Sequence, residues 1–251
     1  MLKFVDVNQE TPVKRKTDSR KKDFNEIYDQ YITDKAKEQS SRCSQCGVPF
    51  CQIHCPLQNN IPDWLKLTAE GRLKEAYEIS QSTNNMPEVC GRICPQDRLC
   101  EGNCVIEQSG HGTVTIGSIE KYITEKAWEN GWVKPIDVKN SKNQSIGIIG
   151  SGPAGLEATR CLSKRGYDVT LAEKNPFIGG RVTKERLLPG LSAWGRVVDY
   201  REGQINKLKN VNIYLESEIT KKDILEFDFE HIEIAISSGS ESDTPSTICC
   251  V

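Results

Sequence analysis

The second half of the chain alternates short apolar segments with amphipathic ones. Apolar runs of strand length lie at 145–149, 168–173, 211–215 and 231–236. Between them the pattern predicts helices over 153–165 and about 194–208. Strands that alternate with helices predict βαβ units and a parallel sheet. We therefore expect an α/β, Rossmann-like domain over residues 145–238, followed by a polar, disordered tail over residues 239–251.

The first half has a different pattern, in which short helical segments separate cysteine-rich loops. Helices are expected over about 24–37, from residue 60, over 73–81 and over 117–130. Pro62 would lie in the first turn of the second helix, and Gly131 would end the last one. This predicts a polar N-terminal extension with a helix over residues 1–40, an all-α domain over 41–133 and a linker over 134–144.

The composition changes this picture mainly by setting the redox environment. The 33 basic and 35 acidic residues nearly balance, which gives no general case for nucleic acid as a partner. The longest apolar run, 146–149, is too short to span a bilayer, and the N-terminus lacks an apolar signal region. We therefore expect a cytoplasmic protein without membrane contact, whose thiols stay reduced. The basic run from Lys14 to Lys22 is interpreted as a solvated terminus, with docking on an acidic partner as the alternative.

Eight of the eleven cysteines lie in two groups. The first group, C-x2-C-x4-C-x3-C-P, consists of Cys43, Cys46, Cys51 and Cys55. The second group, C-x3-C-P-x4-C-x3-C, consists of Cys90, Cys94, Cys100 and Cys104. Three thiols in one loop with a fourth before proline resemble the ferredoxin run, in which the fourth cysteine ligates the other cluster. We favour two [4Fe–4S] clusters; a zinc site and structural thiols are the alternatives.

A glycine-rich motif, Gly150-x-Gly152-x-x-Gly155, follows the first predicted strand. Its glycines permit a tight turn, a close approach of the backbone to a pyrophosphate, and close packing of the helix on the sheet. Glu173 ends the next strand, where a carboxylate accepts hydrogen bonds from an adenosine ribose. A Gly-Gly-Arg turn at 179–181 follows, which favours FAD over NAD. The expected cofactor-binding residues are Gly150, Ser151, Gly152, Pro153, Ala154, Gly155, Glu173, Lys174, Gly180 and Arg181.

Residues 1 to about 175 resemble the small (beta) subunit of NADPH-dependent glutamate synthases, and less closely the N-terminal domain of dihydropyrimidine dehydrogenases. The stretches that carry the resemblance are CSQCGVPFCQIHCP, VCGRICPQDRLCEGNC, TIGSIEKYITEKAWENGW and IGIIGSGPAGLEA. The resemblance implies that NADPH reduces FAD and that two [4Fe–4S] clusters pass electrons to a large, glutamate-forming subunit.

The same resemblance implies which residues ligate the clusters. One cluster would use Cys43, Cys46, Cys51 and Cys104. The other would use Cys55, Cys94, Cys100 and an oxygen ligand from Glu120, with Cys90 as a neighbour and not a ligand. We expect Glu120 at the opening of its helix, where the alternative is a solvated glutamate that favours the helix dipole.

Two departures from the family pattern stand out. After about residue 178 the sequence instead looks like the nucleotide-binding domain of the trimethylamine dehydrogenase family. Ser237-Ser238-Gly239 replaces an expected Ala-Thr-Gly turn, and no second glycine motif for NADPH follows. These departures predict an incomplete FAD domain that holds FAD weakly and lacks the NADPH site.

The sequence therefore favours an electron-transfer module of a flavin and iron–sulfur oxidoreductase, without catalytic residues of its own. The alternative is a non-catalytic iron–sulfur adaptor that retains the Rossmann half as a scaffold.

Overall fold

The computed structural model describes residues 1–227 and 229–236. The chain forms two compact units, Met1–Lys134 and the residues from Pro135 onward. The expectations for Ser237-Ser238-Gly239 and for the tail over 239–251 lie outside the described residues. Among the helices of the described residues, none is long and apolar enough to cross a membrane.

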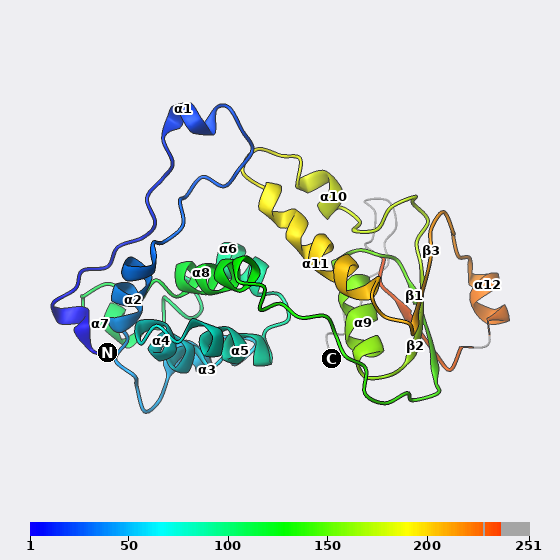
Figure 1. The fold of residues 1–251 in the computed structure, drawn as a ribbon, viewed down its shortest axis with the longest axis horizontal. Coiled ribbons are helices and arrows are strands. Elements are labelled where there is room, and N and C mark those ends of the chain that lie inside the picture. The colour runs from blue at the N-terminus through cyan, green and yellow to red at the C-terminus, as the bar shows by residue number, and fades with distance from the viewer. Residues whose placement is uncertain (228, 237–251) are drawn as a thin grey trace. The chain divides into compact units, whose positions relative to one another are not determined.

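The first unit is all-helical, as the pattern predicts (Figure 1). Its elements are η1 (Lys3–Val5), α1 (Thr17–Arg20), α2 (Thr33–Ser41), α3 (Phe50–Ile53), α4 (Ile61–Ala69), α5 (Leu73–Thr83), α6 (Pro87–Ile93), α7 (Val105–Gln108) and α8 (Ile116–Glu129). Pro62 lies in the first turn of α4, as expected, since its fixed backbone angle suits that position. Gly131 adopts φ 63° just after α8, where glycine ends a helix at little cost.

Helices α4 and α8 contribute the largest share of the buried core of the first unit. Helix α8 buries Ile119, Tyr122 and Ile123, whose spacing places them on one face of the helix. Helix α4 contributes Trp64, which is 1% exposed and donates its indole N–H to Asn59 Oδ1 at 3.0 Å. This packing fixes the chain on both sides of the cysteine-rich loops.

The prediction of a helix over 24–37 is wrong for its first part. Residues 24–32 run in an extended loop, and Lys14 pairs with Tyr28 in an antiparallel bridge. The Arg15 guanidinium holds this hairpin by donating to Asp23 Oδ1 at 3.0 Å and to the Glu26 carbonyl at 3.1 Å. Because these contacts are tertiary, the local pattern does not report them, and α2 begins only at Thr33.

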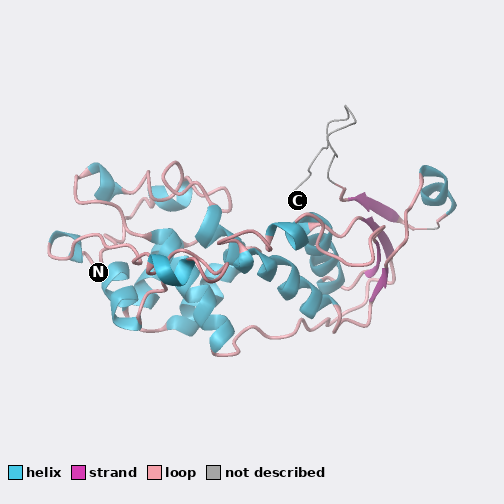
Figure 2. Ribbon diagram, turned by 90° about the horizontal axis from the view of Figure 1, so that it is seen from above, coloured by secondary structure: helices cyan, strands magenta, loops and turns pink. Residues whose placement is uncertain are grey.

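The second unit is a parallel α/β domain. Its elements are β1 (Ser145–Ile149), α9 (Pro153–Lys164), β2 (Asp168–Ala172), α10 (Val182–Glu185), η2 (Ser192–Gly195), α11 (Arg196–Ile205), β3 (Val211–Tyr214), α12 (Lys221–Glu226) and β4 (His231–Ile234). The strands pair in the order β3-β2-β1-β4, all in parallel. Helices α9 and α11 cover one side of the sheet and α12 lies on the other (Figure 1), and Figure 2 shows the strands from above. The predicted fold class is therefore confirmed.

The residues before and after position 178 share one core. Ile148 and Leu156, which precede it, belong to the same buried cluster as Val182, Val198 and Ile205, which follow it. The two stretches therefore pack as one domain.

Candidate functional site

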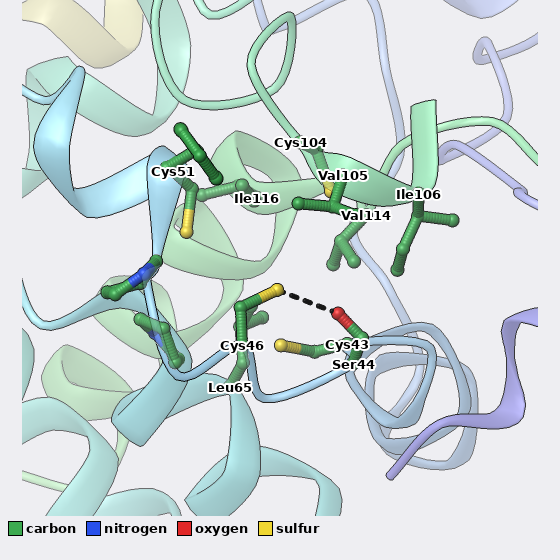
Figure 3. A pocket seen from close by; sticks show the side chains of 13 residues that line it. Cys43, Ser44, Cys46, Cys51, Leu65, Cys104, Val105, Ile106, Val114 and Ile116 are labelled. Atoms are coloured by element: carbon green, nitrogen blue, oxygen red, sulfur yellow. Dashed lines mark hydrogen bonds between the residues drawn. The ribbon is translucent and has the colours of Figure 1, made fainter. Parts of the chain in front are cut away.

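Four cysteines from both groups line one pocket of the first unit. Cys43 follows α2, Cys46 lies in the next loop, Cys51 is in α3, and Cys104 precedes α7. Figure 3 shows their side chains around a common space. Apart from Ser44, the other lining residues are Pro49, Phe50, Pro62, Leu65, Val105, Ile106, Val114 and Ile116. A soft donor set in an apolar wall suits an iron–sulfur cluster, whose reduction potential depends on how far its surroundings exclude water.

Hydrogen-bond donors lie against the sulfurs of this pocket. Gln45 approaches Cys43 Sγ with its backbone N–H at 3.5 Å and its side-chain amide at 3.3 Å. The Ser44 hydroxyl lies 2.9 Å from Cys46 Sγ. Burial, together with the neighbouring Cys43 and Cys104, raises the pKa of Cys51 to about 12. In the metal-free protein this thiol therefore keeps its proton, and a metal would have to displace it.

A second set of side chains meets around Cys100. The pKa of Cys100 is raised by burial first and then by the charges of Glu101, Glu120 and Cys55. A hydrogen bond from Cys90 lowers the pKa of Cys94 to about 7. The charge of Cys94 acts in turn on Glu120. Cys55 and Glu120 thus interact electrostatically with Cys100, Cys94 interacts with Glu120, and Cys90 is hydrogen-bonded to Cys94.

Glu120 is not the solvated glutamate that the alternative interpretation expects. It is in the second turn of α8, is 8% exposed, and accepts a hydrogen bond from Asn84 Nδ2 at 2.8 Å. Burial raises its pKa to about 8. The helix begins one residue earlier than predicted, at Ile116, so Glu120 is its fifth residue and lies just past the first turn in which it was expected. The solvated alternative is wrong because the carboxyl is buried and lies within reach of the Cys94 charge.

Asn84 connects the residues that compete for the last ligand position. Its amide donates to Glu120, while its carbonyl oxygen accepts from Cys90 Sγ at 3.6 Å. The sequence patterns missed Asn84, and they missed Ser44 and Gln45 as well. Ser44 and Gln45 could have been predicted from their position between Cys43 and Cys46, because residues between the cysteines of a C-x2-C pair lie close to the sulfur atoms.

In the described part of the chain, no three His, Cys, Asp or Glu side chains converge closely enough to hold a single metal ion. In a cubane each iron takes one protein ligand, so its ligands need not meet at one point.

The glycine motif forms the turn between β1 and α9, at the carboxyl end of the sheet. Gly150 has φ 98°, and a Cβ there would lie 2.6 Å from the Ala235 carbonyl oxygen. A Cβ on Gly155 would lie 1.9 Å from the Gly150 oxygen, so the helix start requires glycine. By contrast, a Cβ added to Gly152 would meet no atom within 4 Å, so the face of Gly152 is open to a ligand. This is the edge of the sheet where nucleotides bind in doubly wound folds.

The Gly-Gly-Arg turn lies against this motif. The Gly179 N–H donates to the Ser151 carbonyl at 2.9 Å, and a Cβ on Gly180 would lie 3.0 Å from Gly152 Cα. Pro153 and Ala154 begin α9. The structure therefore brings the 150–155 and 179–181 segments together, as the prediction of one nucleotide site requires.

Both carboxylate oxygens of Glu173 accept hydrogen bonds from other groups of the protein. Its Oε2 accepts from the Ser151 N–H at 2.9 Å and from the Ser151 hydroxyl, and its Oε1 accepts from Asn175 N at 2.9 Å and Nδ2 at 2.6 Å. Burial opposes ionisation, but these bonds outweigh it and lower the pKa of Glu173. A carboxylate has about four acceptor positions, and all are used. A ribose hydroxyl would have to replace one of these donors. Lys174 follows directly, and the exposed Arg181 pairs with Glu185 at 2.9 Å.

Family models divide the chain close to the boundary between the two units. Residues 20–132 match the model described as dihydropyrimidine dehydrogenase domain II, 4Fe-4S cluster. Residues 148–210 match the model of an NAD(P)-binding Rossmann-like domain.

Curated relatives make the assignment more specific. The glutamate synthase [NADPH] small chain of Azospirillum brasilense is 57% identical over 201 residues, which is 80% of this chain and 41% of that protein. Over these residues, this chain is similar to the glutamate synthase small chain. The Escherichia coli (strain K12) small chain is 45% identical over 183 residues, 73% of this chain and 39% of that protein. The chain thus spans about two fifths of the length of these relatives.

A solved structure, histamine dehydrogenase from Rhizobium sp. 4-9, is 34% identical and covers 80% of this chain and 26% of its own, with a TM-score of 0.41. The match to the Azospirillum brasilense small chain covers 201 residues of this chain and so must extend past residue 178, which means that the prediction that this similarity fades there is wrong. The resemblance of the later residues to the trimethylamine dehydrogenase family stays a prediction.

Proposed function

We propose that this chain is an electron-transfer module of a flavin and iron–sulfur oxidoreductase of the glutamate synthase type. The observation that carries the proposal is the pocket lined by Cys43, Cys46, Cys51 and Cys104 within a domain of the 4Fe–4S family. Cysteines from two distant groups meet there, as crossed cluster ligation requires. The identity with small chains of glutamate synthase supports the class of enzyme.

Two [4Fe–4S] clusters are proposed, each a one-electron carrier when bound. Cys43, Cys46, Cys51 and Cys104 would hold the first cluster. Cys55, Cys94, Cys100 and Glu120 would hold the second, and their mutual electrostatic contacts support this. The chain's own contribution is to orient the sulfurs through Gln45 and Ser44 and to exclude water with the apolar wall.

FAD is the proposed cofactor of the second unit. The open face of Gly152 would admit its pyrophosphate, the start of α9 would favour the phosphate charge, and Glu173 would take the ribose. For the ribose to bind, the Ser151 hydroxyl is the simplest donor to move, because it can rotate away from Glu173 without a change of backbone.

The partners follow from the relatives and are part of the proposal. The names of the relatives include NADPH, so NADPH is the proposed source of electrons in the whole protein, and a large glutamate synthase chain is the proposed acceptor. The nine described cysteines are free thiols, which supports a reducing compartment such as the cytoplasm.

The test is whether electrons from a reduced flavin reach the clusters of the purified chain. Under anaerobic conditions, photoreduced FAD is mixed with the chain, and the clusters are followed by EPR spectroscopy. We expect a reduced-cluster signal together with FAD binding. Clusters that assemble but accept no electrons from bound flavin would favour the non-catalytic adaptor.

A matched pair of variants isolates the FAD site. Gly152→Ala fits the fold, since nothing lies within 4 Å, but its methyl group would face the pyrophosphate. Gly203→Ala in α11 is equally free of contacts and serves as the control. We expect weaker FAD binding in the first variant only. Equal binding by both variants would place the flavin elsewhere.

A further inference from the structure

Arg42 is a fully buried cation next to the first cysteine pocket. It directly precedes Cys43 and is 0% exposed. Its guanidinium donates to four backbone carbonyls, those of Val7, His111, Gly112 and Thr113. The carbonyls satisfy the N–H groups but leave the positive charge without a counter-ion.

Buried charges in proteins are normally paired. Two other arginines of this chain with buried side chains follow that rule. Arg92 pairs with Glu26 at 2.7 Å and with Glu125 at 2.5 Å. Arg201 pairs with Glu157 at 2.8 Å. By contrast, no carboxylate among the described residues forms an ion pair with Arg42, which makes its charge unusual.

Arg42 lies next to the wall of the first cysteine pocket. Its guanidinium donates to the Thr113 carbonyl, and the next residue, Val114, lines the pocket together with Cys43. Arg42 is therefore adjacent to the pocket in sequence, through Cys43, and in space, through the segment that contains Val114. A cluster with four thiolate ligands carries net negative charge and would be the missing counter-ion.

The second site has no such free charge. The side chain of Arg92, two residues before Cys94, is also buried, but its charge is offset by two carboxylates. The proposed oxygen ligand Glu120 adds a carboxylate to that site. Lys121 also pairs with Glu26, so the charges of this network are balanced, and among the described residues the second site has no buried cation without an ion-pair partner like Arg42.

We propose that Arg42 is a positioning residue that raises the reduction potential of the first cluster, so that this cluster is reduced before the second. The inference rests on the proposed function, because it needs the clusters to be present. One electron added to the first cluster makes it more negative by one charge, and a nearby uncompensated cation favours that state. No bond forms or breaks, and no proton is required. The amide donors of Gln45 on Cys43 act in the same direction.

The experiment is an EPR-monitored titration of the iron-loaded chain with dithionite as the electron donor. Arg42→Gln and Arg42→Lys both lose the planar set of donors, but only the first loses the charge. Arg98→Gln removes an exposed arginine near Cys100, whose charge water screens, and is the matched control.

We expect Arg42→Gln to make reduction of the first cluster about tenfold less favourable, which is about 59 mV for a one-electron couple. Arg42→Lys should retain most of the wild-type potential, and Arg98→Gln should change neither cluster. Equal potentials in wild type and Arg42→Gln, with iron content unchanged, would overturn the inference and leave the proposed function standing. Absence of iron from the wild-type chain would overturn the proposed function itself.

A second measurement decides the matter if Arg42→Gln loses its first cluster. Cys46 is a proposed ligand of the first cluster, so Cys46→Ser identifies the spectrum of that cluster. In the wild type, the cluster with this spectrum should be the one that is reduced at the higher potential. If Cys100→Ser instead alters the spectrum of the cluster that is reduced at the higher potential, the second cluster is reduced first and the inference is wrong.

Discussion

Glu157 offers the sharpest test of the second unit, because it joins the stretches before and after residue 178. It lies in α9, two residues after the last glycine of the motif, and is largely buried. Its carboxylate accepts from Arg160 Nε at 2.9 Å and from Arg201 Nε at 2.8 Å. Glu157→Gln keeps the shape of the side chain but removes the negative charge that these two buried guanidinium groups share.

Removal of one partner from a buried ion pair costs about 3 to 5 kcal/mol. For a domain of about 100 residues, each 1 kcal/mol lowers the melting temperature by roughly 4 to 8 °C. We therefore expect the thermal transition of the second unit to fall by more than about 10 °C, as measured by differential scanning calorimetry. Glu185→Gln, which removes the partner of the exposed Arg181, is the control and should cost about 1 kcal/mol or less.

The contribution of Glu157 to the stability of the second unit should also depend on pH. Burial opposes the charge of Glu157, but Arg160 and Arg201 outweigh it and lower its pKa below the ordinary value of 4.5. As the pH falls, the carboxyl of Glu157 is therefore protonated at a higher pH in the unfolded chain than in the folded chain. The stabilisation is fully present above the pKa of the unfolded state, and it is lost as the pH falls through the pKa of the folded state. The difference between wild type and Glu157→Gln should shrink in that range. A variant as stable as wild type at neutral pH would refute the claim that the ion pair between Glu157 and Arg201 stabilises the packing of the two stretches.

Other substitutions test the sites one by one. Glu120→Ala should alter the spectrum of the second cluster alone, and Cys90→Ser should leave both clusters intact, as measured by EPR and iron analysis. If Cys90→Ser removes a cluster and Glu120→Ala changes no spectrum, Cys90 is the ligand. Gly155→Ala would place a methyl group 1.9 Å from a backbone oxygen, and since overpacking costs about 1 to 3 kcal/mol or more, it should lower thermal stability and abolish FAD binding together. Gly203→Ala, with open space around it, should do neither; equal melting temperatures for the two glycine variants would contradict the tight turn.

The sequence predicted the parts of the fold that local patterns encode. All four strands and the helix after the glycine motif lie close to their expected ranges, because strand length, apolar runs and glycine positions are local signals. The helix expected from residue 24 failed because the Arg15 contacts with residues 23 and 26 stabilise an extended hairpin there. No pattern within that segment reports such a partner.

Some features of the candidate site were also predictable from the sequence, and others were not. The resemblance of the cysteine motifs to a known family predicted that Cys104 belongs with the first group, and the pocket places it there. The surroundings of the sulfurs were not predictable, since the burial of Arg42 depends on carbonyls 35 and 69 residues away in the chain. The hydrogen bonds that occupy Glu173 were missed for a similar reason, because they depend on the conformation of the Ser151 and Asn175 turns.

The central claim is that the paired cysteine groups hold two [4Fe–4S] clusters, and metal analysis of the anaerobically purified chain tests it most directly. Iron and acid-labile sulfide are measured on the same sample as its visible absorption spectrum. The claim predicts about eight irons and eight sulfides per chain, with broad thiolate-to-iron absorbance. Zinc bound in place of iron, with no sulfide and no visible absorbance, would contradict it.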